Sequence, residues 1–161
     1  MSNGILCFAN NNGKIDYLKQ AIFLANRAKQ YLNLPVSIAT SSKRDLDYFY
    51  KEQASIFDHI IEIPDVYDNT KRYYNGSLNY EYLLFKNYNR INSYNLSPYN
   101  KTLVMDTDVI ICNDSLSKAF DMVEDFQIYR HCVDLCDWRD SSEFNFINDI
   151  GIPFYWATCF Y

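Results

Sequence analysis

Glycine is scarce in this chain, and no glycine-rich phosphate-binding motif is present. Four glycines occur among 161 residues, and neither G-x-G-x-x-G nor G-x-x-x-x-G-K-[ST] appears. A nucleotide site in this chain therefore cannot rest on the backbone cradle of a dinucleotide-binding fold or of a phosphate loop. Phosphate groups would have to be held by a metal ion and by cationic side chains.

Long apolar runs and an excess of positive charge are also missing. No apolar segment approaches the ~20 residues needed to span a bilayer, so we expect no membrane span. The 15 Lys and Arg residues face 20 Asp and Glu residues, which gives a net charge of −5 and argues against a nucleic-acid partner. The apolar Ile5–Ala9, with no positive residue before it, is too short for a signal peptide, so we expect a cytoplasmic protein.

The cysteines form no evident pairs. They number five and are scattered along the chain, which fits unpaired thiols in a reducing compartment. The one candidate zinc set, His131 with Cys132 and Cys136, lacks a credible fourth ligand. We therefore expect all five cysteines to be unpaired.

Apolar runs and amphipathic segments alternate along the chain, and the length is that of one domain covering residues 1–161. Such alternation predicts an α/β fold with a mainly parallel sheet covered by helices on both faces. The expected strands are Gly4–Ala9, Pro35–Thr40, His59–Ile63, Thr102–Met105, Phe126–Val133 and Phe154–Tyr161; the expected helices are Lys14–Leu32, Lys43–Ala54, Leu78–Tyr94 and Ser115–Asp121, and Asp65–Asn79 is expected to be a mobile loop.

Two aspartates lie between apolar residues in the central segment. Thr102–Met105 predicts a buried strand, Asp106 and Asp108 follow it, and Val109–Cys112 is apolar again. Carboxylates in such a run are costly unless their charge is offset, and in an extended chain these two would point to the same side. Mg²⁺ or Mn²⁺ would offset the charge and keep coordination positions open for phosphate oxygens. The alternative is a strand end with a polar turn and both carboxylates in water.

Ligands of open parallel sheets collect at the carboxyl ends of the strands. Three expected strand ends carry polar residues, namely 9–11, 40–41 and 106–108, and the first and last suit a nucleotide and a metal-bound diphosphate. Arg90 is the candidate cation for that diphosphate, and a solvated helix position is the alternative. A metal bridging two phosphates would neutralise the charge that builds on a leaving nucleoside diphosphate.

These residues together resemble the GT-A type glycosyltransferases, which are nucleotide-diphospho-sugar transferases often met in phages, viruses and bacteria. The resemblance covers nearly the whole chain. It rests on Gly4–Asn10 with Ile15-Asp16-Tyr17 and Ala21, on Asn89-Arg90-Ile91, on Ser97-Pro98-Tyr99 leading into Thr102–Asp108, and on Trp156-Ala157-Thr158. It implies a Rossmann-like GT-A sheet and the metal-dependent transfer of a sugar from a nucleotide-sugar donor to a sugar, protein or lipid acceptor, in the host cytoplasm if the protein is viral.

The resemblance also implies roles for individual residues, although none of them is assigned as catalytic. Asp106 and Asp108 would hold Mn²⁺ or Mg²⁺ and the donor diphosphate. The implied nucleotide-sugar-binding residues are Ala9, Asn10, Asn11, Tyr17, Arg90, Asp106 and Thr107, and the implied acceptor-side residues are Asp134, Asp137 and Trp138. Tyr17 would lie against the base or ribose, with a position in the core as the alternative.

The last residues form an apolar, strand-like run with no polar tail after it. Members of this family commonly carry an acceptor-binding part beyond such a segment, so we expect the chain to lack its C-terminal part. Phe154–Tyr161 is then expected to be a strand without its normal neighbours, with an exposed edge that promotes self-association and with weak or no sugar transfer.

Three other functions compete with this interpretation. A non-catalytic module that binds a sugar or a nucleotide-sugar would use the same pocket. A phosphatase of the haloacid dehalogenase type also carries D-x-D after a strand, but there the motif usually opens the domain, and here about a hundred residues precede it. A calcium loop of the EF-hand type is excluded because Ile110 occupies a ligand position and no glycine follows.

Overall fold

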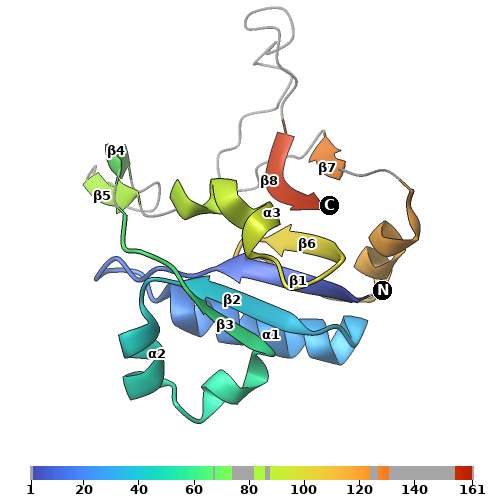
Figure 1. Ribbon diagram of the computed structural model, residues 1–161, viewed down its shortest axis with the longest axis horizontal. Helices are drawn as coiled ribbons and strands as arrows, with labels where there is room; N and C mark the ends of the chain where they lie inside the picture. Colours follow the sequence, from blue (N-terminus) through green and yellow to red (C-terminus); the bar gives the residue numbers. More distant parts are fainter. Residues whose placement is uncertain are drawn as a thin grey trace, which may run out of the picture.

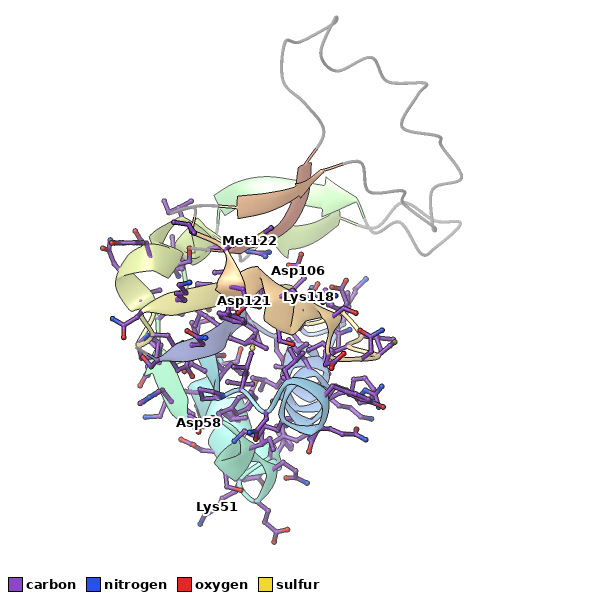
Figure 2. All side chains as sticks on the ribbon, turned by 90° about the vertical axis from the view of Figure 1, so that its right-hand side faces the viewer. Lys51, Asp58, Asp106, Lys118, Asp121 and Met122 are labelled. Atoms are coloured by element: carbon purple, nitrogen blue, oxygen red, sulfur yellow. The ribbon has the colours of Figure 1, made fainter. Side chains whose placement is uncertain are left out.

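The computed structural model describes residues 2–66, 68–73, 82–85, 88–123, 127–130 and 155–160, with a six-stranded sheet at the centre (Figure 1). Four strands run parallel in the order β3-β2-β1-β6, and β8 then pairs antiparallel with β6 and with β7. The strands are β1 (Asn3–Phe8), β2 (Val36–Thr40), β3 (His59–Glu62), β6 (Lys101–Met105), β7 (Gln127–Arg130) and β8 (Tyr155–Phe160). Figure 2 shows the molecule turned by 90°, with Asp58 on the β3 side of the sheet and Asp106 on the β6 side.

The main helix, α1 (Tyr17–Leu32), begins where Asp16 caps it and ends where Asn33 turns the chain. The Asp16 carboxylate accepts a hydrogen bond from the Lys19 backbone N–H at 3.1 Å, and Asn33, the C-cap, adopts the left-handed conformation at φ 52°. Residues 14 and 15 stay outside the helix because the Asn12 side chain accepts hydrogen bonds from their N–H groups. The helix therefore starts three residues later than the apolar spacing alone predicts.

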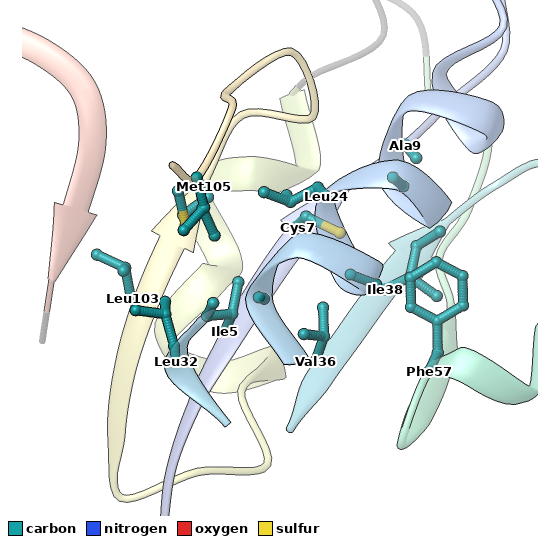
Figure 3. Close-up of a cluster of buried hydrophobic side chains, with 14 of the residues drawn as sticks. Ile5, Cys7, Ala9, Leu24, Leu32, Val36, Ile38, Phe57, Leu103 and Met105 are labelled. Carbon is teal, nitrogen blue, oxygen red and sulfur yellow. The ribbon is translucent and has the colours of Figure 1, made fainter. Parts of the chain in front are cut away.

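Alternate residues of the parallel strands face two separate apolar clusters. Ile5 and Cys7 of β1, and Ala9 directly after it, join a large cluster beneath α1 (Figure 3), to which α2 (Lys43–Phe49) and η3 (Ser115–Asp121) also contribute. Leu6 and Phe8 face the other side, where α3 (Ser93–Leu96) packs against a smaller cluster. Each fully buried Ile or Leu side chain contributes about 1.5–3 kcal/mol. The expected α/β fold with a mainly parallel sheet flanked by helices is confirmed.

Strand β6 is central, as predicted. Thr102–Met105 are all buried, and β6 lies between β1 and β8, with Leu103 opposite Ile5 and Met105 opposite Cys7 in the parallel register. The second apolar run does not continue the strand: Ile110 is 62% exposed, Ile111 is buried in the core, and Val109 packs partly buried against it. The chain leaves the sheet directly after Met105, so Asp106 lies at the strand end and not in the middle of a buried segment.

The segment before β6 fastens this strand to the start of β1. The Tyr99 ring crosses Gly4, where an added Cβ atom would lie 2.5 Å from the ring. The Tyr99 hydroxyl hydrogen-bonds the Ser37 hydroxyl at 2.6 Å, and the Asn100 side chain accepts a hydrogen bond from the Ser2 N–H at 3.1 Å. The Ser-Pro-Tyr lead-in therefore has a structural role in placing β6 beside β1.

Two predictions for the middle of the chain are wrong. The residues expected to form a loop include a strand, β4 (Asp68–Tyr73). The described residues of the expected helix Leu78–Tyr94 form β5 (Tyr82–Phe85), a 3-10 helix η2 (Tyr88–Asn92) and the start of α3. Strands β4 and β5 form an antiparallel pair. A four-residue run of aromatic and leucine side chains at 82–85 fits a strand as well as a helix, and pairing with β4 decides for the strand. Similarly, the second expected helix ends at Phe49 and is followed by a separate 3-10 turn, η1 (Gln53–Ile56).

The C-terminal strands confirm one expectation and correct another. Strands β7 and β8 form within the ranges predicted for them. However, β8 pairs with β6 on one side and with β7 on the other, so the expectation that it lacks neighbours and exposes an unpaired edge is wrong. Among the described residues, no helix combines the length and the apolar character required to cross a membrane.

We predict that Gly4→Ala destabilises the protein by about 1–3 kcal/mol, because the new methyl group must displace the Tyr99 ring and break its bond to Ser37. Urea unfolding followed by circular dichroism would measure this. In a Tyr99→Ala background the ring is absent, so the same glycine substitution should cost much less. Additive effects of the two substitutions would show that the close approach does not matter.

Two cysteines with described side chains, Cys7 and Cys112, are unpaired; the other three lie outside the residues whose side chains are described. Cys7 is fully buried, and this burial raises its pKa to about 12. We predict that iodoacetamide at pH 8 alkylates exposed Cys112 in the native protein and Cys7 only after unfolding, as measured by peptide mass spectrometry. Equal rates at both thiols in the native state would contradict the burial of Cys7.

Candidate site at the carboxyl edge of the sheet

Three parallel strands, β1, β2 and β6, end at the same side of the sheet (Figure 1). We call the residues that follow them, 9–11, 41–42 and 106–108, the carboxyl edge. Residues 9–11 and 106–108 were expected site positions, and the parallel register brings them to one side of the molecule together with residues 41 and 42. Their side chains nevertheless have different roles.

The polar residues after β1 and β2 mainly hold one another. The Asn10 side-chain oxygen accepts hydrogen bonds from the Ser41 N–H at 2.7 Å and from its hydroxyl at 3.1 Å, and Asn10 is 4% exposed. The Asn11 N–H donates to the Ser42 hydroxyl at 3.0 Å. Ala9 is fully buried in the core. Of the three residues expected to line a nucleotide pocket, only Asn11 presents appreciable surface, whereas Asn10 and Ala9 are buried.

Asp16 organises the loop between β1 and α1. Besides capping the helix, its carboxylate accepts hydrogen bonds from the Tyr50 hydroxyl and from the Asn11 amide. Partial burial would raise the pKa of Asp16, but these hydrogen bonds lower it below the usual value of 3.8. Tyr17, next in the chain, is partly buried and packs against the large core cluster, which is the alternative to a contact with a nucleotide.

The two aspartates of the D-x-D motif lie in a turn. The Val109 N–H donates to the Asp106 carbonyl at 3.3 Å, so the chain is not extended between Asp106 and Asp108 and the alternation of a strand does not apply to them. Thr107 is buried and its hydroxyl bonds the Gln20 side chain at 3.1 Å. Asp108 is exposed and makes no hydrogen bond or ion pair within the described part of the chain.

Arg90 lies in η2 and its side chain reaches the D-x-D turn. One guanidinium N–H forms an ion pair with Asp106 Oδ1, and the two side chains are only 20% and 29% exposed. The neighbouring Asn89 is buried and donates a hydrogen bond to the Pro64 carbonyl at 2.8 Å, which anchors η2 near the end of β3. Arg90 is therefore not a solvated surface residue, and the structure brings it to the predicted metal ligand.

Two residues of α1 support the turn and were not predicted from the sequence. Gln20 holds Thr107, and Arg27 donates from Nε to the Ile111 carbonyl at 2.9 Å. Arg27 also stacks its guanidinium 4.2 Å from the centre of the Tyr31 ring. Their spacing of seven residues, two turns on one face of the helix, was the available sequence signal. Together these contacts fasten the segment after β6 to the longest helix.

The donor set at the D-x-D turn suits Mg²⁺ or Mn²⁺. Asp106 and Asp108 offer hard carboxylate oxygens, and Mg²⁺ is commonly bound by one or two carboxylates together with water and phosphate oxygens. Within the ranges that the structure describes, no three His, Cys, Asp or Glu residues lie together as a complete ligand set. A cation at this turn would thus share its coordination sphere with ligand oxygens.

A cavity of about 530 Å³ adjoins the carboxyl edge at Asn11. It lies between the loop after β1 and helix α2, and its lining is both aromatic and charged: Asn11, Gly13, Lys14, Ile15, Asp16, Asp45, Phe49 and Tyr50. Its volume is in the range of small-molecule sites. Gly13 adopts φ +83°, a conformation that glycine permits at no steric cost, and so shapes the rim.

The expected acceptor-side residues, Asp134, Asp137 and Trp138, lie outside the described residues. A comparison with protein-family models found no match, and a comparison with curated proteins found none either. The functional interpretation of this edge therefore depends on the geometry of the chain itself.

We predict that Asp16→Asn destabilises the protein at neutral pH by at most about 1 kcal/mol, because the bonds it weakens are exposed to solvent. The folded-state pKa of Asp16 lies below the unfolded value, so its stabilising contribution is present above pH 3.8 and is lost as the pH falls through the lower, folded-state pKa. The difference between wild type and variant in urea unfolding should therefore shrink on acidification from pH 7 to pH 3.

The matched control is Asp47→Asn, which removes an exposed carboxylate from α2 without breaking a hydrogen bond within the described residues. Tyr50→Phe should reproduce part of the Asp16→Asn effect, because it removes one of the bonds that lower the pKa of Asp16. A stability difference for Asp16→Asn that is constant from pH 7 to pH 3 would contradict this assignment.

Proposed function

We propose that this protein is a metal-dependent glycosyltransferase with a GT-A type fold, which binds a nucleotide-sugar donor at the carboxyl edge. The observation that carries the proposal is the position of Asp106. This carboxylate follows a buried central strand, begins a turn that contains Asp108, and is approached by the guanidinium of Arg90. Two carboxylates that could serve a divalent cation thus lie in one turn after β6, and a guanidinium that could serve a phosphate contacts the first of them.

The chemistry of these side chains suits a diphosphate. Asp106 and Asp108 would hold Mg²⁺ or Mn²⁺, which when bound supplies the positive charge that stabilises a leaving nucleoside diphosphate. The planar guanidinium of Arg90 can donate two parallel hydrogen bonds to phosphate oxygens. The chain has no glycine-rich phosphate cradle, so these groups would provide the positive charge that the donor requires.

The surroundings of the turn favour a site held in advance of binding. Thr107 is tied to Gln20, and the following segment is tied to Arg27, so α1 holds the backbone of the turn. Rigid support of this kind keeps ligating groups near their productive geometry. The cavity beside Asn11 offers space for the nucleoside or sugar portion of the donor.

We predict that a nucleoside diphosphate with Mn²⁺ raises the melting temperature by several degrees. Ligand at a hundred times its dissociation constant adds ~2.7 kcal/mol to the stability of the folded state. Differential scanning fluorimetry with UDP, GDP, ADP and CDP, each with and without Mn²⁺, would measure this and identify the base. Asp108→Asn should abolish the Mn²⁺-dependent part, while Asp47→Asn, an exposed charge on α2, should preserve it.

A Mn²⁺-dependent shift that persists in Asp108→Asn would refute the assignment of the metal site. The alternative function, a module that binds a sugar or nucleotide-sugar without catalysis, is distinguished by the donor itself. Incubation with the matching nucleotide-sugar and an acceptor mixture should release the nucleoside diphosphate if the protein is a transferase. Binding without release would support the module.

A further inference from the structure

We infer that the Arg90–Asp106 ion pair is an internal latch, through which the binding of a divalent cation and the binding of an anionic diphosphate become cooperative. The inference rests on the proposed function of the carboxyl edge and adds a coupling between its two ligands. Arg90 occupies an oxygen of the carboxylate that a cation would require. Asp106 likewise occupies the guanidinium that a phosphate would require.

The latch is partly withdrawn from water, which makes its opening costly. The Arg90 and Asp106 side chains are 20% and 29% exposed. A divalent cation and a guanidinium at one carboxylate repel each other, so cation binding must weaken the contact of Arg90 with Asp106. The displaced guanidinium loses one charged partner, which is unfavourable for a partly buried group, and a diphosphate beside the cation would replace that partner.

Both ends of the latch are anchored, so neither side chain can leave by moving its whole segment. Asn89, buried next to Arg90, is bonded to the Pro64 carbonyl. Asp106 follows directly on β6, and Thr107 after it is bonded to Gln20. The exchange of partners is therefore a movement of the Arg90 side chain between Asp106 and a phosphate within reach of it.

The thermodynamic consequence is reciprocal. If diphosphate strengthens cation binding by a certain factor, the cation strengthens diphosphate binding by the same factor. We expect about a tenfold coupling, within the usual range for linked sites. The cation alone and the diphosphate alone should each bind weakly, because each must open the ion pair without the compensating partner.

The first test measures Mn²⁺ affinity with and without inorganic pyrophosphate, with the unbound Mn²⁺ and the Mn²⁺–pyrophosphate complex determined separately by electron paramagnetic resonance. In Arg90→Gln, Mn²⁺ alone should bind about five- to tenfold more tightly than in the wild type, because its competitor is gone, and the effect of pyrophosphate should be smaller, with only the part due to direct coordination of Mn²⁺ by phosphate oxygens remaining. Arg90→Lys retains the charge and should restore the weak binding of Mn²⁺ alone.

The second test examines the other side of the latch and uses a matched pair of variants. Asp106→Asn and Asp108→Asn each remove one negative charge from the same turn, but only Asp106 is bonded to Arg90. Without any metal, pyrophosphate should bind Asp106→Asn several-fold more tightly than Asp108→Asn, as measured by isothermal titration calorimetry. This arm does not depend on whether the Arg90 variants fold.

The outcomes separate the latch from the proposed function. The latch is wrong if the two aspartate variants bind pyrophosphate equally. It is also wrong if Mn²⁺ affinity is unchanged in Arg90→Gln while Asp108→Asn still abolishes Mn²⁺ binding, and in that case the metal site would stand. If wild type binds neither Mn²⁺ nor pyrophosphate, separately or together, the proposed function fails and the latch fails with it.

Discussion

The parallel pairing of β6 with β1 is the constraint on which the rest of this structure depends. These strands are remote in sequence, and their backbone hydrogen bonds bring the turn at Asp106 to the same side of the sheet as the loop after β1. The close contact of Tyr99 with Gly4 and the bond of Tyr99 to Ser37 hold the start of β6 in place. A shift of one residue in this register would turn Leu103 away from the large cluster, so core packing and site geometry are set by the same pairing.

The site itself combines a fixed backbone with movable charges. Hydrogen bonds with the Gln20 and Arg27 side chains of α1 hold the turn after β6, and Arg90 forms an ion pair with Asp106 in the same turn. Such an arrangement keeps ligating oxygens in place while allowing one long side chain to change partners. This arrangement suits a site that binds a cation and an anion together, because the charges of Arg90 and Asp106 are then balanced both before and after binding.

Much of the fold could be predicted from the sequence, because several of its elements are determined by local pattern. The apolar runs of β1, β2, β3 and β6 and the three- and four-residue spacing in α1 correspond closely to the observed elements. The prediction failed at residues 68–73, 82–85 and 88–92, where short aromatic runs fit either period and the antiparallel pairing of β4 with β5 decided the outcome for the first two. The Ser-Pro-Tyr segment, which carried part of the family resemblance, is explained here by its packing on Gly4 rather than by contact with a ligand.

The sequence by itself determined that Asp106 follows a buried strand and that Asn33 ends α1, because burial periodicity and helix capping act over a few neighbouring residues. Only the tertiary structure decided that Arg90 reaches Asp106, that Asn10 is buried and holds Ser41, and that Gln20 holds Thr107. It also inserted β8 between β6 and β7, which a strand-like run at the end of the sequence could not reveal. Each of these contacts joins residues from separate elements, and a local pattern of side chains carries no information about which distant partner the folded sheet will bring to it.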